Sequence, residues 1–320
     1  MNQEKLIEEL ATRFGYLPYM IERYLKMFGL EETIRYLEAN EKPLIPSIRV
    51  NTLKIGPHEL KGLLERKGFV LELIDGIPNG FKIIKQSLNV GSLHEYLQGY
   101  FYIQNIASMI APIVLNPKSN EVVIDMCSAP GGKATHLAEL MKNEGKLILI
   151  ERNLKRIAAL EINVRRMGVK NTIIINMDAR KLKKLKIKAD KILLDAPCTG
   201  EGLIRQDSYR KKSKTYQDIK KMARIQKELL LAGLNMLKTN GELLYCTCSI
   251  APEENEFVID ECLNNSSQYQ IVKIESPLGI PGFNKVFDKN LIKDLQNSVR
   301  IYPHLHDTIG FFFCLIKKEI

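Results

Sequence analysis

Apolar residues near the amino terminus recur at the spacing of α-helices. Leu6, Leu10 and Phe14 lie four positions apart before Gly15, and a second run at helical spacing ends at Gly29. Glycine is a common residue just beyond the end of a helix, so both glycines are suitable helix ends. The pattern predicts a helical segment over residues 1–45, which is too short to enclose a core alone.

Residues 46–110 show a different pattern, in which short strands alternate with one clear helix. A helix is expected to begin at Pro57, because proline is favoured in the first turn. Strands are expected at 47–53, near 70–74 and at 81–84. Residues 1–110 are therefore predicted to form a small α+β domain, helical over 1–45 and α+β over 46–110.

From Glu121 onward, short and wholly apolar strands alternate with longer helices. This alternation is typical of a parallel sheet with helices on both faces. The expected strands are 122–125, 147–151, 172–176, 191–195, 242–247, 269–274 and 311–316, and the expected helices are 133–141, 154–167, 218–237 and 252–263. Residues 111–320 are thus predicted to form an α/β domain with a doubly wound, mostly parallel, seven-stranded sheet.

Composition narrows the class of protein. Of the 320 residues 45% are apolar, but no run approaches the roughly 20 apolar residues that a membrane span needs. The first residues, Met1 to Lys5, lack the basic and then apolar pattern of a secretory signal. The six cysteines do not form the spaced framework of a small disulfide-rich protein. We therefore expect a cytoplasmic protein with reduced thiols, no membrane partner and a monomeric state.

The chain carries a formal net charge of +10, with basic residues concentrated in two clusters. The first cluster lies within residues 180–191, and the second lies within residues 205–221 and is interleaved with Tyr209 and Tyr216. Lysines and arginines bind phosphates, and tyrosines stack on bases, so the second cluster is expected to contact RNA. The first cluster is equally compatible with a solvated surface.

A loop of small residues follows the first strand of the predicted sheet and leads directly into a helix. It runs from Met126 to Lys133, just after Asp125. Small residues there allow a ligand to approach the backbone closely at the positive end of the helix. The loop is not a phosphate-binding P-loop, because Cys127 stands where that motif has glycine and Ala134 where it has serine or threonine.

Acidic residues at successive strand ends point toward the same crevice. Glu151 ends the second strand and is placed to bind ribose hydroxyls, Asp178 follows the third strand and suits an adenine amino group, and Asp195 ends the fourth. These acids favour a cofactor with an adenosine and a positive charge, which describes S-adenosylmethionine. The predicted cofactor-binding residues are Cys127, Ser128, Ala129, Pro130, Gly131, Gly132, Lys133, Glu151, Arg156, Asp178 and Asp195.

Two cysteines, Cys198 and Cys248, lie 50 positions apart, each where an apolar strand gives way to a loop. A pair of thiols in one crevice suggests covalent chemistry divided between a nucleophile and a proton handler. Pro197 holds the first of these loops in an extended form. Cys246 is interpreted as a packing residue. The spacing of cysteines and histidines does not match a zinc site, and no metal is expected.

Several motifs resemble those of the RNA cytosine-5 methyltransferases of the Sun family (RsmB/NOP class), and among these the shorter archaeal tRNA enzymes. The resemblance covers nearly the whole chain. The matching segments are 49–54 (RVNTLK), 125–133, 195–202 (DAPCTGEG), 245–256 (YCTCSIAPEENE) and 300–313. Ile309 departs from the pattern, since an acidic residue is common at that position.

The resemblance implies a Rossmann-like catalytic domain that transfers a methyl group from S-adenosylmethionine to carbon 5 of cytosine through a covalent cysteine adduct. It assigns Cys248 as the nucleophile, Cys198 to product release, and Asp195 to a contact with the base. The implied substrate is tRNA at the junction of the variable loop and the T stem, with rRNA as the alternative.

Two further alternatives stay open from the sequence. In a DNA cytosine-5 methyltransferase the nucleophile would be Cys198, although the Glu-Asn-Val motif of those enzymes is not found in the expected place. An RNA-binding module without catalysis would need none of the cysteines, yet every expected catalytic residue is present.

Overall fold

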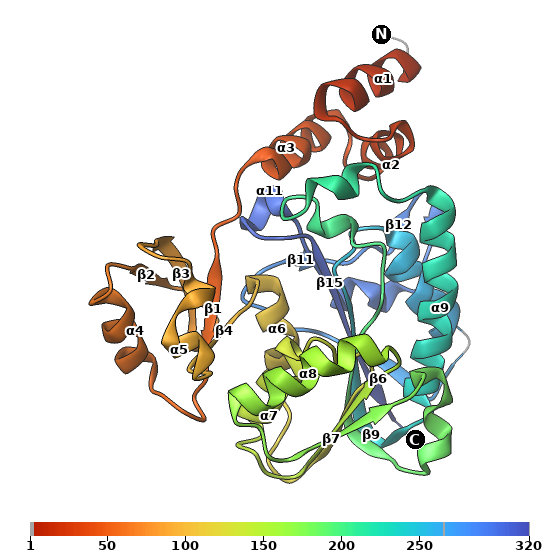
Figure 1. Ribbon diagram of the computed structural model, residues 1–320. Coiled ribbons are helices and arrows are strands. Elements are labelled where there is room, and N and C mark those ends of the chain that lie inside the picture. The colour runs from red at the N-terminus through yellow and green to blue at the C-terminus, as the bar shows by residue number, and fades with distance from the viewer. Residues whose placement is uncertain (1–2, 265, 320) are drawn as a thin grey trace.

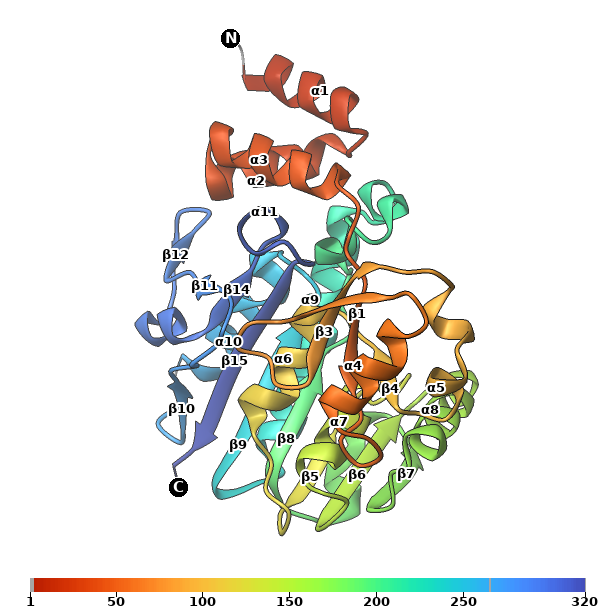
Figure 2. The same ribbon diagram turned by 90° about the vertical axis from the view of Figure 1, so that its left-hand side faces the viewer.

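The computed structural model describes residues 3–264 and 266–319, which form three parts (Figures 1 and 2). Helices near the amino terminus lie at one end, a small antiparallel sheet lies to one side, and a large sheet layered between helices makes up the rest. Met1 and Asn2, expected in the first helical segment, and Ile320, expected in the second domain, lie outside the described residues.

The predicted amino-terminal helices are present as α1 (Gln3–Phe14), α2 (Pro18–Phe28) and α3 (Leu30–Glu41). Gly15 and Gly29 separate them with φ angles of 74° and 77°, which glycine adopts without strain. Their apolar residues pack with Ile204, Ile250 and Tyr302 from distant parts of the chain. The helices therefore share a core with the large carboxy-terminal part.

The small sheet has the strand order β2-β3-β1-β4, with antiparallel neighbours. Its strands are β1 (Ser47–Val50), β2 (Val70–Leu73), β3 (Gly80–Lys85) and β4 (Phe101–Ile103), accompanied by α4 (Pro57–Glu65) and α5 (His94–Leu97). Buried side chains of the strands and α4, among them Ile48, Leu60 and Phe101, form a separate core.

The large sheet has the strand order β11-β14-β15-β9-β8-β5-β6-β7, and β10 pairs with β15 as well. The strands are β5 (Val122–Asp125), β6 (Lys146–Glu151), β7 (Thr172–Asn176), β8 (Ala189–Asp195), β9 (Leu237–Thr247), β10 (Tyr269–Val272), β11 (Ile280–Pro281), β14 (Val299–Ile301) and β15 (Phe311–Lys318). Strands β5 to β9 pair in parallel, and β15 runs antiparallel to β9.

All seven predicted strands belong to this sheet, and the predicted α/β class is confirmed. Within the described residues the sheet has nine strands rather than seven, because the short strands β11 and β14 extend one edge. β10 and β14 pair with different halves of β15, at residues 315–318 and 311–313. A separate hairpin is formed by β12 (Lys285–Val286) and β13 (Lys289–Asn290).

Helices cover both faces of the large sheet, as expected for a doubly wound fold. One face packs against α6 (Ile106–Leu115), α7 (Gly132–Leu140) and α8 (Leu154–Met167), and the other against α9 (Tyr216–Leu234), α10 (Glu256–Leu263) and the 3-10 segment η2 (Ala179–Leu185). No helix in the described part of the chain is long and apolar enough to cross a membrane.

The helix predicted over 252–263 is interrupted. A 3-10 turn, η5 (Pro252–Glu254), is followed by Asn255 at φ −119° and ψ −99°, and α10 begins only at Glu256. The Asn255 side chain accepts a hydrogen bond from Thr247 Oγ1 and donates one to the carbonyl of Ser249. These contacts with the loop after β9 accompany the break in the helix.

The chain order of the strands reverses direction between β5 and β8. β6 and β7 extend the sheet on one side of β5, whereas β8 and β9 extend it on the other. Such a reversal opens a crevice beyond the carboxyl ends of the two central strands. Asp125 and Asp195 end these strands, so the crevice lies at the predicted site.

Candidate active site

Two cavities meet at the carboxyl ends of the central strands. The first has a volume of ≈ 250 Å³ and the second a volume of ≈ 270 Å³. Their common wall is formed by Cys127, Ala129, Asp195, Leu203 and Cys248. The crevice is therefore divided into two compartments that share two cysteines and a carboxylate.

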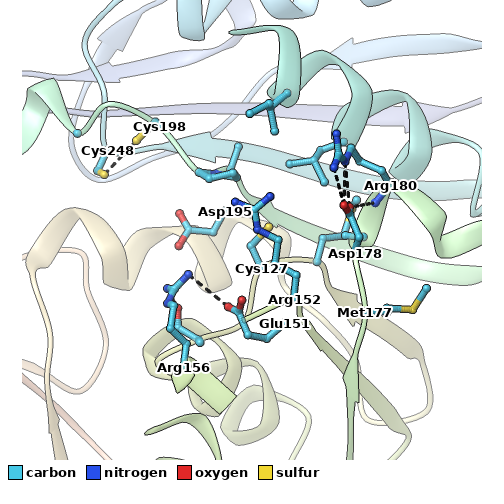
Figure 3. A pocket seen from close by; sticks show the side chains of 18 of the residues that line it. Cys127, Glu151, Arg152, Arg156, Met177, Asp178, Arg180, Asp195, Cys198 and Cys248 are labelled. Atoms are coloured by element: carbon cyan, nitrogen blue, oxygen red, sulfur yellow. Dashed lines mark hydrogen bonds and ion pairs between the residues drawn. The ribbon is translucent and has the colours of Figure 1, made fainter. Parts of the chain in front are cut away.

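Polar residues at the ends of β6 and β7 line the first cavity (Figure 3). The buried Glu151 accepts a hydrogen bond from the backbone N–H of Asn153 at 2.8 Å, and its other oxygen lies 3.3 Å from Arg156 Nη1. Apolar side chains of Met126, Met177, Ile225 and Leu229 also line this cavity; Met126 begins the predicted loop, but the sequence patterns gave no signal for the other three.

Asp178 lines the same cavity, but its carboxylate is already engaged. Arg180 Nη2 donates to Asp178 Oδ2 at 2.6 Å, and the backbone N–H of Arg180 donates to Oδ1 at 3.0 Å. The hydrogen bonds from Arg180 hold the pKa of Asp178 below its usual value. Arg180, counted in the first basic cluster, is in turn paired with Glu228 at 2.7 Å.

The predicted cofactor loop faces both cavities. Cys127 and Ala129 line the first as well as the second, whereas Ser128, Pro130, Gly132 and Lys133 line only the second. Gly131 lines neither cavity. It has a φ of +110°, and a Cβ there would lie 3.2 Å from Leu160 Cδ1, so this position requires glycine for backbone geometry.

Hydrogen bonds within the fold fix the loop. Ser128 Oγ donates to the carbonyl oxygens of Asp125 and Ile150, both at 3.0 Å. Arg156 Nη2 donates to the carbonyl of Ala129, which joins the loop to the start of α8. The predicted residue Arg156 therefore supports the loop and Glu151 together.

Lys133 and Asp195 form an ion pair beside the second cavity, with Lys133 Nζ 2.7 Å from Asp195 Oδ2. Burial lowers the pKa of Lys133, but the attraction of Asp195, the hydrogen bond to it and the nearby Cys246 and Cys248 together raise the pKa, so Lys133 stays charged. Asp125 lies nearby and is 1% exposed, and burial followed by repulsion from Asp195 raises its pKa to about 7.

Cys198 and Cys248 lie side by side, with their sulfur atoms 3.2 Å apart (Figure 3). They follow the adjacent parallel strands β8 and β9, which explains how residues 50 positions apart meet. A hydrogen bond from the backbone N–H of Gly202 to the carbonyl of Cys248 joins the two loops at 2.9 Å. The hydrogen bond with Cys248 and burial raise the pKa of the Cys198 thiol, which favours its protonated form.

Cys246 is buried, as its interpretation as a packing residue requires, but it has a second contact. Its sulfur lies 3.7 Å from Asp195 Oδ1, on the opposite carboxylate oxygen from Lys133. Burial raises the pKa of Cys246, so the thiol is protonated and can donate to that oxygen. Asp195 is thus oriented from both sides.

The first basic cluster is spread between opposite ends of the sheet. Arg180 lies at the first cavity, whereas Lys188 and Lys191 lie at the start of β8, the end remote from Asp195. Lys188 donates to the carbonyl of Asn235, and Lys191 is paired with Glu242. Three of the seven basic residues in this cluster are therefore engaged in the fold, and Lys181, Lys183, Lys184 and Lys186 are exposed.

The second basic cluster contains both structural and exposed residues. Arg205 donates to the carbonyls of Lys42 and Pro43, and Lys211 Nζ lies 2.5 Å from Glu41 Oε1. These two residues fasten the amino-terminal helices to the segment after Cys198. The exposed members of the cluster are Lys212, Lys214, Lys220 and Lys221.

In residues 3–264 and 266–319, no three or more histidine, cysteine, aspartate or glutamate side chains are grouped in a way that would hold a metal ion.

Comparison with protein families finds matches over most of the chain. A family model described as "16S rRNA methyltransferase RsmB/F" matches residues 112–317. A model described as the "N-terminal domain of 16S rRNA methyltransferase RsmF" matches residues 17–106.

Curated relatives extend this similarity. The chain is 38% identical over 319 residues to a mouse protein named "28S rRNA (cytosine-C(5))-methyltransferase", covering 98% of the chain and 40% of that protein. It is 37% identical over 301 residues to the Pyrococcus abyssi "tRNA (cytosine(49)-C(5))-methyltransferase", covering 93% of the chain and 95% of that protein. The chain spans about two fifths to half of the length of the eukaryotic rRNA relatives it matches.

Solved structures agree with these relatives. A methyltransferase homolog protein from Pyrococcus horikoshii superposes with a TM-score of 0.89 at 38% identity, and the match covers 98% of both chains. NSun6 from the same organism, solved with SFG, gives a TM-score of 0.84 at 28% identity over 94% of this chain and 97% of that one.

Proposed function

The chain belongs to the RsmB/F methyltransferase family, as the sequence resemblance predicted, and from this membership we propose that it methylates carbon 5 of cytosine in RNA. The observation that carries the proposal is the pair of thiols 3.2 Å apart, with Cys248 on the wall between the two cavities and Cys198 in the first. One compartment suits a cofactor and the other suits a base, with a nucleophile accessible from both.

We propose S-adenosylmethionine as the cofactor of the first cavity. The NSun6 structure was solved with SFG, an analogue of that molecule. Glu151 supplies a buried acceptor suited to ribose hydroxyls, and the methionine and aliphatic walls suit an adenine ring. Asp195 supplies negative charge where the two cavities meet, which fits a cationic group. When bound, the cofactor supplies the methyl group.

Asp178 is proposed as a contact of the adenine amino group, but its role differs from that of a free carboxylate. Arg180 already donates to both of its oxygens. Each carboxylate oxygen has two acceptor positions, so one further donor can be accommodated. Arg180 would then orient Asp178.

In the second cavity, Asp195 and Lys133 are proposed to hold the target base. Asp195 is held by Lys133 on one oxygen and by Cys246 on the other. A carboxylate fixed in this way can accept a hydrogen bond from the edge of a cytosine near ring nitrogen 3. The charge of Lys133 beside it favours the electron-rich ring that forms when a thiolate adds to carbon 6.

The two thiols are proposed to act in sequence. Cys248 lines both cavities, and its thiolate would add to carbon 6 of the cytosine. Cys198 lines only the first cavity, and its raised pKa keeps it protonated beside the Cys248 sulfur. Release breaks the bond between carbon 6 and the Cys248 sulfur while the proton on carbon 5 passes to a water molecule, and the Cys198 thiol is placed to donate its proton to the departing sulfur.

The proposed substrate is tRNA, because the Pyrococcus abyssi tRNA enzyme matches this chain over nearly its whole length. rRNA is the second candidate, favoured by the names of the family model and the mouse relative. In either RNA the target base must leave its helix to enter the second cavity.

We further propose a two-part organisation, with an RNA-binding accessory unit over residues 1–110 and a catalytic unit over 111–320. The separate core of the small sheet supports this division. Helix α6 crosses the proposed boundary and packs on the large sheet, so the units are joined through it. A cytoplasmic monomer is proposed too, since the six free cysteines suit a reducing compartment.

Trapping the covalent complex tests both the cysteine roles and the substrate. The Cys198→Ala variant, incubated with total cellular RNA and S-adenosylmethionine, should accumulate an adduct that survives a denaturing gel, because the thioether is formed but not released. Cys248→Ala should form no adduct. Sequencing of the trapped RNA should return tRNA.

The opposite pattern, an adduct with Cys248→Ala and none with Cys198→Ala, would reverse the two roles. Trapped rRNA would replace tRNA as the substrate. If no variant forms an adduct and the wild-type protein transfers no labelled methyl group to RNA, the proposed function is wrong.

A further inference from the structure

Glu254 lies fully buried between the loops that carry the two cysteines. It ends the 3-10 turn η5, directly before the break at Asn255. Its carboxylate touches neither cavity, so it has no direct part in the chemistry proposed above. The four hydrogen bonds that the carboxylate accepts come from residues that support the cysteine loops.

On the side of Cys198, Glu254 binds the next residue twice. Oε1 accepts from the backbone N–H of Thr199 at 2.8 Å, and Oε2 accepts from Thr199 Oγ1 at 2.6 Å. Gln226 of α9 donates to Glu254 Oε1 at 3.2 Å and to the carbonyl of Pro197 at 2.9 Å. The residues on both sides of Cys198, Pro197 and Thr199, are therefore held by the buried side chains of Gln226 and Glu254.

On the side of Cys248, the same carboxylate binds the next residue. Ser249 Oγ donates to Glu254 Oε2 at 2.5 Å and itself accepts from the backbone N–H of Ala251 at 3.1 Å. Thr199 and Ser249, each directly after a cysteine, thus share one carboxylate oxygen.

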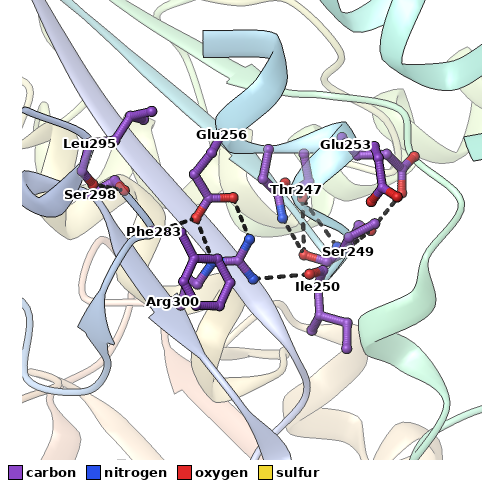
Figure 4. A network of polar contacts seen from close by, with 12 residues as sticks. Thr247, Ser249, Ile250, Glu253, Glu256, Phe283, Leu295, Ser298 and Arg300 are labelled. Carbon is purple, nitrogen blue, oxygen red and sulfur yellow. Dashed lines mark hydrogen bonds and ion pairs between the residues drawn. The ribbon is translucent and has the colours of Figure 1, made fainter. Parts of the chain in front are cut away.

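A second network holds the far side of this loop (Figure 4). Arg300 Nη1 donates to the carbonyl of Ile250 at 2.9 Å, and Arg300 is paired with the buried Glu256. This network holds the segment after Ser249, and within the described residues no hydrogen bond of Arg300 or Glu256 reaches the Cys198 loop. Glu254, in contrast, binds the residues that directly follow both cysteines.

We propose that Glu254 is a positioning residue that sets the distance and orientation of the Cys198 and Cys248 thiols. The inference rests on the cysteine chemistry proposed above. A carboxylate suits this place because it accepts from four donors and needs to donate to none. Truncation to alanine would leave a buried backbone N–H and two hydroxyls without their acceptor, and the loops would move to satisfy them.

The donors are arranged so that an amide can replace the carboxylate. Oε1 accepts hydrogen bonds from N–H groups, which can only donate. Oε2 accepts hydrogen bonds from the hydroxyls of Thr199 and Ser249. Hydroxyls can accept as well as donate. In Glu254→Gln the oxygen can keep the N–H donors while the new NH₂ group donates to the hydroxyls.

Kinetics of Glu254→Ala and Glu254→Gln, measured on the full chain with the RNA identified by trapping, test the positioning role. Glu254→Ala should lower kcat on the order of 10²-fold, the usual effect of a misplacement of about 1 Å. The KM for RNA and the Kd for S-adenosylmethionine should stay unchanged, and Glu254→Gln should recover most of kcat.

Glu253→Ala is the matched control. Glu253 lies in the same turn and is also buried, but its carboxylate binds Arg23. It should lose stability without the fall in kcat. If Glu254→Ala keeps its kcat per folded molecule, the proposal is wrong. If Glu254→Gln is as inactive as Glu254→Ala, the charge rather than the position matters, and the proposal is also overturned.

A chemical probe of the thiols separates this inference from the proposed function. Phenylarsine oxide binds two neighbouring thiols, forming two As–S bonds and releasing its oxygen as water with the two thiol protons. Wild type and Glu254→Gln should bind one equivalent rapidly by intact mass, and Glu254→Ala at least several-fold more slowly. Cys198→Ala and Cys248→Ala give the background.

Equal capture rates for Glu254→Ala and wild type would overturn the positioning role even if methylation is confirmed. The expected difference in capture, found in a protein that methylates no RNA, would support the positioning role while the proposed function fails.

Discussion

Asp125 illustrates how a single buried charge at this site lowers the stability of the fold. Asp125 is buried at the end of β5. This burial, together with repulsion from Asp195, raises its pKa from 3.8 to about 7. The folded state therefore binds this proton more tightly than the unfolded state. Its contribution to stability is fully present below pH 4 and is lost as the pH rises to about 7.

The variant Asp125→Asn should remove this dependence. The amide stays neutral, and its oxygen can still accept from the backbone N–H of Cys127, as Asp125 Oδ1 does at 3.2 Å. Relative to wild type, the free energy of unfolding should rise between pH 5 and pH 8, by up to about 3 kcal/mol. Urea unfolding at both pH values measures it, and a constant difference would show that Asp125 is already ionised in the folded protein at pH 5.

At the scale of the single residue, sequence patterns identify which side chains can react or bind better than they identify which neighbours those side chains contact. They placed Glu151, Asp195 and both cysteines at one crevice, because the carboxyl ends of parallel strands must meet. They gave no sign that Arg180 binds Asp178, or that Glu254 binds both cysteine loops. Such contacts join residues far apart in the chain, and only the packing of whole elements brings them together.

Helix α2 is fastened to the active-site loops by a buried arginine. Arg23 Nη1 lies 2.9 Å from Glu201 of the segment after Cys198, and Arg23 Nη2 lies 2.6 Å from Glu253 of η5. The three side chains are less than a tenth exposed. A distant helix thus pairs with both loops that surround the cysteines.

Removal of this arginine should be costly. Arg23→Ala leaves two carboxylates buried without their partner, which should destabilise the protein by about 3–5 kcal/mol. Thermal or urea unfolding measures the loss. Lys26→Ala on the same helix is the control, since its pair with Glu22 is about half exposed and should change the melting temperature little. Equal effects of the two variants would contradict a special role for the buried pair.

Among the elements, the buried parallel strands are the most predictable. β5, β6 and β8 read as continuous apolar runs because helices cover both of their faces. β11 and β14 are only two and three residues long, too short to show a pattern in the sequence, although all three residues of β14 are buried. β9 begins at Leu237, whereas the sequence predicts a strand only from 242. Asn240 and Gly241 are typical turn residues and hide this start, although they lie within the strand.

Over the whole molecule, the net charge of +10 is not evenly available to RNA. Arg180, Arg205, Lys191 and Lys211 are committed to ion pairs within the fold. Lys212, Lys214, Lys220 and Lys221 remain exposed near the start of α9. Composition gives the total charge, but the fold decides which cations face a partner.

The salt dependence of RNA binding should reveal this division. The double variant Lys212→Ala/Lys214→Ala should lower the slope of log K against log salt concentration by about 1 to 2, since each phosphate contact contributes about 0.7–0.9. Lys186→Asn is the control, because Lys186 precedes β8 at the remote end of the sheet and asparagine tolerates its positive φ. Filter binding across a salt series provides both slopes, and a larger change for the control would place the RNA elsewhere.

The core shared between α1–α3 and the large carboxy-terminal part has a consequence for any attempt to shorten the chain. Ile204, Ile250 and Tyr302 are each 1% exposed because the three helices cover them. A fragment beginning at residue 46 would turn this buried seam into an apolar surface patch, the kind of surface on which proteins aggregate. Although these helices are far from Cys198 in the sequence, they support the loop that carries it by packing against Ile204.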